Sequence, residues 1–157
     1  MKINDITHEI IDSAYKVHTK LGPGLLESAY RICLSYELRK KGLKVEEEKA
    51  LPLVYEEIRL DCGYRLDMLI EDKVIVELKT VEKFTDVHIA QVLTYLKFSE
   101  IYAGLLINFN ANFPDTDLII SNIFTALKDD VGILILCKPS SISFSISLSQ
   151  PVETIKR

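Results

Sequence analysis

The sequence of 157 residues has few cysteines and no long apolar run, and each shortage excludes a class of protein. Its three cysteines, Cys33, Cys62 and Cys137, are odd in number and far apart, which argues against a disulfide framework and against a zinc ribbon. No apolar run approaches the roughly 20 residues that a membrane-spanning helix needs. The first five residues also lack the apolar stretch of a signal peptide. The sequence therefore predicts no membrane association and a reducing, cytoplasmic location.

The chain also lacks a surplus of basic residues. It has 19 lysines and arginines against 23 aspartates and glutamates, which gives a formal net charge of −4. Proteins that bind nucleic acid usually carry a basic surface, so this balance argues against that function. Carboxylates that hold a metal ion, however, count as negative only until the cation neutralises them. The hydrophobic content of 48% is typical of a globular protein, and the length suits one ordinary domain.

Two short apolar segments alternate their side chains as β-strands do. Residues 65–70 and 74–79 follow this pattern, and three polar residues, 71–73, separate them. The spacing predicts a β-hairpin with a register centred on Asp72.

In this register, three charged side chains share one face of the hairpin. Asp67 lies opposite Glu77, and Lys79 follows two residues later on the same face. A slip of one residue would move Asp67 to the other face. Carboxylates in apolar strands are costly to bury unless something binds them. A divalent metal that acts on a phosphodiester would give them a use.

A helix is predicted over residues 85–98, directly after the hairpin. Thr85 or Asp86 is suited to be its N-cap. Two sets of residues recur at helical spacing, an apolar stripe of Ile89, Leu93 and Leu96 and a polar face of His88, Gln91 and Tyr95. A glutamine and a tyrosine beside the carboxylates can hold nucleic acid by hydrogen bonding and stacking.

These motifs together resemble the PD-(D/E)XK nuclease superfamily. The Gln91-x-x-x-Tyr95 helix resembles that of its RecB-like branch, and Gly24-x-x-Glu27-x-x-Tyr30 matches the signature of its GxxExxY family. Three fixed letters are a weak signal alone, but their order along the chain with the acidic hairpin makes the match strong. The resemblance covers about residues 5 to 109.

The resemblance implies a metal-dependent nuclease that hydrolyses phosphodiester bonds, with Mg²⁺ or Mn²⁺ as cofactor. Its partner would be nucleic acid, DNA before RNA, although the sequence itself does not distinguish the two. The implied catalytic residues are Glu27, Asp67, Glu77 and Lys79. The implied metal ligands are Asp67, Glu77, the Leu78 carbonyl, Glu27 and, in second rank, His18. The implied substrate-binding residues are Gln91, Tyr95 and Tyr30.

Simpler interpretations of the same residues stay open. Glu27 could be an ordinary acidic residue in the first turn of a helix, where it favours the helix dipole. Glu77 and Lys79 could form a plain ion pair, and both tyrosines could pack in the core with a bonded hydroxyl. The competing function is a non-catalytic nucleic-acid- or protein-binding module that keeps the nuclease fold.

The resemblance implies an α/β fold with an αβββαβ core, in which helices flank a mixed sheet. Apolar periodicity predicts one helix that ends at Gly22 and a second from about Leu25 to Lys41, and residues 45–60 predict two strands. Residues 1–110 would form the core, and residues 111–157 an atypical C-terminal extension of the same domain. Within it, residues 141–149 alternate serine with apolar residues. That segment could be a strand at the sheet edge, a strand across a homodimer, or a disordered tail.

Overall fold

The computed structural model describes residues 1–60, 63–110, 120–125 and 131–136. Its elements, in chain order, are α1 (Ile3–Leu21), α2 (Glu27–Lys40), β1 (Val45–Ala50), β2 (Leu53–Tyr55), β3 (Ile58–Leu60), β4 (Arg65–Ile70), β5 (Val74–Lys79), α3 (Asp86–Ser99), β6 (Ala103–Asn108), β7 (Ile120–Thr125) and β8 (Val131–Leu136). In this described part, no helix has the length and apolar character needed to cross a bilayer. The predicted strand at residues 141–149 lies outside the described residues.

Six strands form one mixed sheet in the order β1-β4-β5-β6-β7-β8. Only β5 and β6 run parallel; every other neighbouring pair is antiparallel. A parallel pair requires a crossover connection, and α3 supplies it. The predicted αβββαβ order is therefore confirmed in α2, β1, β4, β5, α3 and β6.

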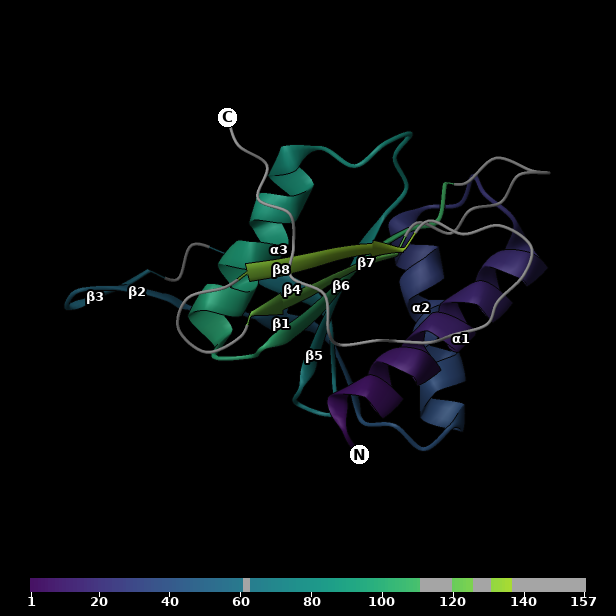
Figure 1. Cartoon of the computed structure of the whole chain (residues 1–157), viewed down its shortest axis with the longest axis horizontal. Coiled ribbons are helices and arrows are strands. Elements are labelled where there is room, and N and C mark those ends of the chain that lie inside the picture. Colours follow the sequence, from purple (N-terminus) through teal and green to yellow (C-terminus); the bar gives the residue numbers. More distant parts are fainter. Residues whose placement is uncertain (61–62, 111–119, 126–130, 137–157) are drawn as a thin grey trace.

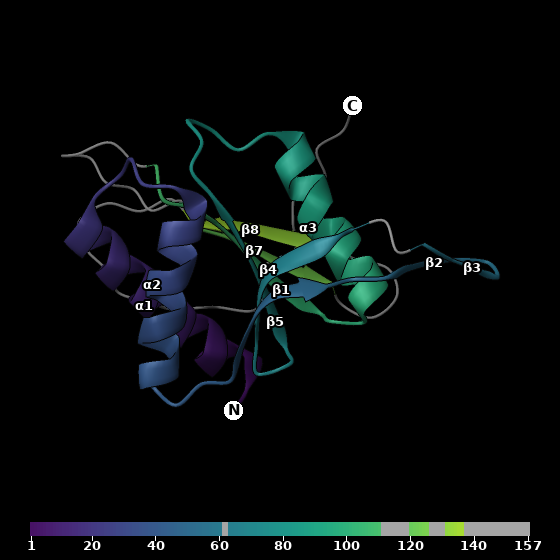
Figure 2. The same ribbon diagram turned by 180° about the vertical axis from the view of Figure 1, so that it is seen from behind.

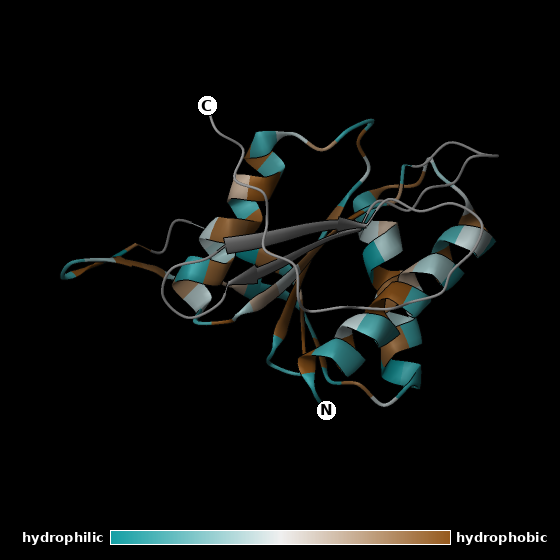
Figure 3. Cartoon of the chain, viewed as in Figure 1, coloured by the Kyte–Doolittle hydropathy of each residue, from teal (hydrophilic) through white to brown (hydrophobic). Residues whose placement is uncertain are grey.

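The helices cover both faces of this sheet, with α1 and α2 on one side and α3 on the other (Figures 1 and 2). Two apolar clusters fill the two interfaces. The larger one joins α1 and α2 to side chains such as Met68, Val76 and Leu78, and the smaller one joins α3 to Leu69, Ile75 and others. Figure 3 shows the apolar colour along the central strands and where α1 and α2 meet. The alternation of strand side chains therefore gives β4 and β5 two buried faces.

The β4–β5 hairpin has the register that the sequence predicts. Ile70 pairs with Val74, Leu69 with Ile75, and Met68 with Val76. The paired residues end with Met68 and Val76, and Asp67 and Glu77 follow one step further along, where the same register would bring them opposite each other. Both carboxylates therefore lie on the α3 side of the sheet.

The first helix ends where the sequence predicts, and the second begins two residues later than predicted. The first helix stops at Leu21, and Gly22, at a φ of 67°, donates its N–H to the His18 carbonyl over 2.8 Å. The second helix begins at Glu27 rather than at Leu25. Leu21, the last residue of α1, is 43% exposed.

Residues 45–60 contain three strands, one more than the sequence predicts. Two strands were expected in residues 45–60, whereas β1 joins the edge of the main sheet and β2 with β3 forms a separate two-stranded sheet. This hairpin projects from the body (Figure 1). Val54, Tyr55 and Ile58 on it are exposed.

Helix α3 lies very close to β6 at Gly104. A Cβ added at Gly104 would meet the Val92 Cγ1 atom at 2.9 Å and the two Leu96 methyl groups at 3.5 Å. Val92 is fully buried, and a β-branched side chain has little rotamer freedom to move aside. The absence of a side chain at Gly104 therefore sets the distance between the helix and the sheet.

We expect Gly104→Ala to lower the free energy of unfolding by about 1–3 kcal/mol through overpacking. The measurement is chemical denaturation monitored by circular dichroism. Shortening the partner in Gly104→Ala/Val92→Ala should relieve the clash, so the double variant should lose less stability than the two single losses added together. Additive losses would show that the contact does not constrain the fold.

Candidate active site

Asp67 and Glu77 bring two carboxylates together inside the sheet. Asp67 accepts a hydrogen bond from the Leu78 backbone N–H at 2.8 Å, and Glu77 is only 2% exposed. In the described part of the chain, the Glu77 Oε2 atom is buried without a hydrogen-bond partner. An unpartnered buried carboxylate oxygen is costly, and a cation would satisfy it.

The surroundings make both carboxyl groups reluctant to ionise. Burial, followed by the charge of Asp67, raises the pKa of Glu77 to about 7. Burial also raises the pKa of Asp67, and the Leu78 N–H together with the charge of Lys79 opposes the rise. Two like charges at close range disfavour each other, and this pattern is common at functional sites.

Lys79 lies beside this pair and is bound to one member of it. Its Nζ donates to Glu77 Oε1 at 2.6 Å, and its side chain is largely buried. Burial alone would lower the pKa of Lys79, but the hydrogen bond and the negative charge of Glu77 outweigh it and raise the pKa. The lysine is therefore a fixed positive charge at the end of β5.

Glu27 reaches the same end of β5 from the opposite layer. Its Oε1 atom accepts a hydrogen bond from the Thr80 N–H at 3.1 Å, and its charge raises the pKa of both Asp67 and Glu77. The start of α2 therefore brings a third carboxylate close enough for its charge to act on the Asp67–Glu77 pair.

His18 lies beside the neighbouring strand end. Its ring stacks on Phe109 with the centroids 6.2 Å apart, and the Phe109 N–H donates to the Lys79 carbonyl over 2.8 Å. Burial lowers the pKa of His18 and so favours the neutral imidazole. Its Nε2 atom is buried without a partner among the described residues. A neutral imidazole with a vacant nitrogen has the chemistry of a metal ligand.

In α3, Gln91 and Tyr95 are joined to each other. The Gln91 side-chain amide donates to the Tyr95 hydroxyl at 2.6 Å, and the charges of Glu77 and Asp67 help burial to raise the pKa of Tyr95. The expected polar face differs in one respect, since Tyr95 is 3% exposed and belongs to the apolar cluster together with Val92 and Leu96. The buried side of α3 therefore includes Tyr95, in the cluster that also contains Ile75 of β5 and Leu106 of β6. His88 accepts a hydrogen bond from the Thr85 N–H at 3.1 Å and so caps the start of α3.

Tyr30 is placed in the core rather than at the carboxylates. It is fully buried, its ring stacks on Phe109 at 4.4 Å between centroids, and its hydroxyl bonds the Gly22 carbonyl and the Leu25 N–H. These contacts hold the turn that leads into α2. They agree with the packing interpretation, and a role in substrate binding stays a prediction.

Two residues near the site, Asn108 and Arg31, belong to none of the motifs identified in the sequence. Asn108 pairs with Lys79 in the sheet, and its amide bonds both the N–H and the carbonyl of Val81, which fixes the loop after β5. Arg31 lowers the pKa of Asp67, so its charge reaches the site. The sequence feature that could have identified Arg31 is its position one helical turn after Glu27, because this spacing puts both residues on one face of α2.

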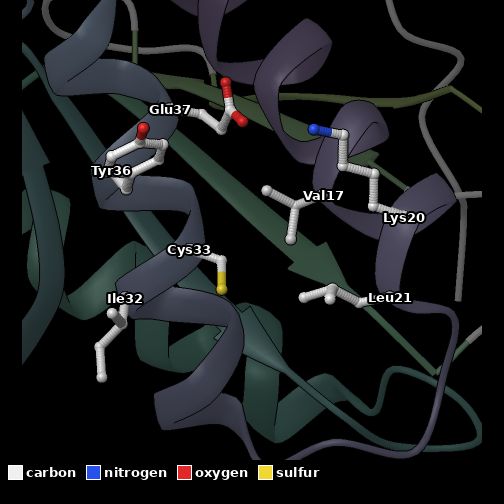
Figure 4. A pocket seen from close by; sticks show the side chains of 7 residues that line it. All are labelled: Val17, Lys20, Leu21, Ile32, Cys33, Tyr36 and Glu37. Atoms are coloured by element: carbon white, nitrogen blue, oxygen red, sulfur yellow. The ribbon is translucent and has the colours of Figure 1, made fainter.

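A groove between α1 and α2 is separate from these residues. It has a volume of about 300 Å³ and contains none of the candidate site residues. Figure 4 shows Val17 and Leu21 of α1 across from Cys33 of α2. The candidate site residues at the strand ends therefore lie outside this apolar groove.

Within the described ranges, no three His, Cys, Asp or Glu side chains are grouped closely enough to hold a metal ion by themselves. The donors that fit a hard divalent cation are the Asp67 and Glu77 oxygens, and a backbone carbonyl such as that of Leu78 could add to them. The unpartnered Glu77 oxygen supports this fit. The role of the Leu78 carbonyl stays a prediction.

Residues 4–119 match a family model described as the PD-(D/E)XK nuclease superfamily. The chain belongs to the PD-(D/E)XK nuclease superfamily. Members typically use divalent metals, and the superfamily relationship indicates a nucleic-acid substrate. No curated protein and no solved structure matches the chain. The superfamily assignment therefore rests on the family model, and the αβββαβ core agrees with it.

The raised pKa of Glu77 predicts how stability depends on pH in the metal-free protein. The pKa rises from 4.5 in the unfolded chain to about 7 in the folded chain, so the folded state holds the proton more tightly. The corresponding stability is fully present below about pH 4.5 and is lost as the pH rises through 7. At about 1.4 kcal/mol per pKa unit, the loss is at most about 3 kcal/mol.

Thermal denaturation from pH 4.5 to 8 in the presence of a chelator measures this loss against Glu77→Gln, which stays neutral throughout. The wild type should lose stability relative to the variant as the pH rises, and added Mn²⁺ should restore only the wild type. Parallel curves for the two proteins would contradict the placement of Glu77.

Proposed function

We propose that the protein is a metal-dependent nuclease that hydrolyses phosphodiester bonds in nucleic acid. The observation that carries the proposal is the Asp67–Glu77 pair, in which Glu77 is buried beside Lys79 and has one oxygen without a hydrogen-bond partner among the described residues. A fold that needed only a stable sheet would gain nothing from two adjacent carboxylates, because apolar residues there would avoid the cost of burying charge.

Each side chain supports a distinct part of the reaction. Asp67 and Glu77 would hold Mg²⁺ or Mn²⁺, which supplies Lewis acidity to the phosphate when it is bound. Lys79 would orient the attacking water and neutralise charge that develops on the phosphate. Glu27, fixed by the Thr80 N–H, can accept a hydrogen bond from a water at the same strand end. Gln91 and Tyr95 would position the substrate from α3.

Finer features of the proposal come from the motifs. The Gly24-x-x-Glu27-x-x-Tyr30 string supports membership of the GxxExxY family, and the Gln91-x-x-x-Tyr95 helix supports the RecB-like branch. We propose DNA as the first substrate to test and a cytoplasmic location. His18 is retained as a candidate ligand because its Nε2 atom lacks a partner among the described residues.

A binding module without catalysis is the second candidate. It is favoured by the direct 2.6 Å contact between Lys79 and Glu77, which leaves the lysine already engaged. The two candidates differ in one measurable property, namely cleavage that depends on a divalent metal.

Purified protein should cleave DNA or RNA in Mg²⁺ or Mn²⁺, and a chelator should abolish the activity. Asp67→Asn should remove both cleavage and metal affinity. The asparagine keeps a side-chain oxygen that can accept the hydrogen bond from the Leu78 N–H, so the local fold should be preserved. Lys79→Ala should lower kcat by about a hundredfold or more with little change in metal affinity, because its role is that of an acid–base or charge-stabilising group. Cleavage assays and Mn²⁺ calorimetry measure the two properties separately.

Matched controls are available at the other end of the same hairpin. Asp72→Asn and Lys73→Ala change the same residue types at exposed positions in the turn, and both should behave like the wild type. Equal activity in the wild type and in Asp67→Asn would indicate a contaminating nuclease. Absence of metal-dependent cleavage on single- and double-stranded DNA and RNA would favour the binding module.

Gln91→Ala should weaken substrate binding or lower kcat and leave Mn²⁺ affinity nearly unchanged, because the amide is uncharged. Tyr95→Phe should cost less than Tyr95→Ala, since phenylalanine keeps the ring that packs in the core and loses only the hydroxyl. Steady-state kinetics with a thermal melt for each variant separate the two effects. If Gln91→Ala lowers the melting temperature and leaves activity per folded molecule intact, its role is structural.

A further inference from the structure

Arg31 is a positive charge at the site whose hydrogen-bonding capacity is only partly used. Its side chain is 18% exposed, and its Nε–H is buried without a hydrogen-bond partner in the described part of the chain. Its closest acidic neighbours are Glu48 Oε2 at 3.5 Å and Glu47 Oε2 at 3.8 Å. Both distances exceed those of charge-assisted hydrogen bonds, which lie near 2.7–2.9 Å. The guanidinium is therefore held near these acids without being saturated by them.

The two acids have better partners elsewhere. Glu47 Oε1 accepts hydrogen bonds from the Ser35 hydroxyl at 2.6 Å and from Arg39 at 3.2 Å. Glu48 Oε1 also contacts Arg65 at 3.4 Å. Neither acid depends on Arg31 alone, so Arg31 can turn its donors to another anion without leaving a carboxylate unpaired.

The position of Glu48 connects Arg31 to the catalytic strand. On β1, Glu47 pairs with Met68 and Lys49 with Leu66, so Glu48 lies at the level of Asp67. The backbone of Glu48 has a φ of 49°, an uncommon conformation for a residue other than glycine, and the pairing of β1 with β4 is interrupted there. The contact with Glu48 therefore brings the Arg31 guanidinium to the strand next to β4, and its charge acts on the Asp67 carboxyl group.

We propose that Arg31 binds a phosphate group of the nucleic-acid substrate beside the Asp67–Glu77 pair. The proposal rests on the nuclease function proposed above. A guanidinium has five donors in a planar fork that matches two phosphate oxygens, and a metal cation does not compete for it. Lys79 already donates to Glu77 at 2.6 Å, whereas the Arg31 guanidinium lies 3.5 Å or more from its acidic neighbours Glu48 and Glu47. By holding one phosphate, Arg31 would fix which linkage of the nucleic-acid strand lies at the carboxylates. Phosphate contacts position a nucleic acid without reading its sequence.

The matched control is Arg39, which lies two helical turns further along α2. Arg31 and Arg39 both lie against Glu47, but Arg39 is 57% exposed. Replacing either arginine by glutamine removes one positive charge and one contact to the same carboxylate. Only Arg31→Gln removes the charge that acts on Asp67. Arg31→Lys keeps the charge and loses the planar fork.

The first readout is binding of fluorescently labelled single- and double-stranded oligonucleotides, together with kcat and KM for cleavage. Arg31→Gln should weaken binding and lower kcat/KM about ten- to a hundredfold, as expected for hydrogen bonds to a charged group. Arg31→Lys should lie between it and the wild type, and Arg39→Gln should stay within about twofold of the wild type, as is usual for exposed ion pairs. The slope of the logarithm of the binding constant against the logarithm of salt concentration should become shallower by about one phosphate contact in Arg31→Gln. The slope should not change in Arg39→Gln.

The second readout distinguishes a phosphate contact from a structural role. Mn²⁺ affinity, measured by calorimetry, should be unchanged or tighter in Arg31→Gln, because a positive charge beside Asp67 has been removed. A site that had lost its shape would bind Mn²⁺ more weakly. Oligonucleotides that each carry a single neutral methylphosphonate linkage test the contact directly. At one linkage, the replacement should weaken binding to the wild type and leave binding to Arg31→Gln unchanged.

Three results would overturn the proposal, and they separate it from the nuclease function. If the wild type cleaves and Arg31→Gln matches Arg39→Gln, the nuclease function stands and the phosphate role of Arg31 is wrong. If Arg31→Gln loses Mn²⁺ affinity in proportion to activity, Arg31 only supports the fold of the site. If the wild type neither binds nor cleaves any of the oligonucleotides, the nuclease function fails and the Arg31 proposal fails with it. Binding that depends on Arg31 without cleavage would support the contact in a binding module.

Discussion

The structure depends on one electrostatic constraint, the close approach of a buried carboxylate, Glu77, and a half-buried one, Asp67, on neighbouring strands of the sheet. Asp67 and Glu77 disfavour each other's ionisation, and burial removes the water that would screen them. The surrounding groups compensate in part, through the Leu78 N–H on Asp67 and the Lys79 amine on Glu77. The remaining Glu77 oxygen has no partner among the described residues. This deficit gives a divalent cation a structural reason to bind.

The topology supplies what surrounds the pair. Parallel pairing of β5 with β6 requires the α3 crossover, which carries Gln91 and Tyr95 over the face that holds both carboxylates. On the other side, the Tyr30 hydroxyl fixes the turn before α2 and so aims Glu27 at the Thr80 N–H. Asn108 then ties the loop after β5 to the neighbouring strand. Elements from both faces of the sheet therefore converge at one strand end.

Local rules were sufficient for the parts of the fold that they govern. The hairpin register followed from the alternation around Asp72, and the helix end at Gly22 followed from its conformational freedom. The burial of Tyr95 could not be derived in this way, because period alone does not say which of two adjacent helix faces meets the sheet. The separate β2–β3 hairpin was missed for a related reason, since short strands leave no mark of which sheet they join.

The sequence was sufficient to propose most residues of the candidate site. It was less informative about the contacts that connect them. The carboxylates and the lysine could be placed on one face by strand periodicity, and Glu27 could be added only through the family motif. Arg31 and Asn108 have contacts that depend on the packing of α2 and on the pairing of β6, which no local pattern records. Glu48 is a further case, because its left-handed backbone opposite Asp67 has no sequence signal such as glycine.

The negative net charge of the chain is a weak argument against a nucleic-acid substrate once the site is considered by itself. Charges separated by more than about 8–10 Å are largely screened at ordinary ionic strength. The charged groups that act on the Asp67–Glu77 pair are Glu27, Lys79 and Arg31, so this set of five carries one excess negative charge when every member is ionised. A bound divalent cation would reverse that excess to one positive charge, which equals in size the single negative charge of a phosphodiester. Attraction of the substrate would then depend on the metal, because the same residues without it would repel phosphate.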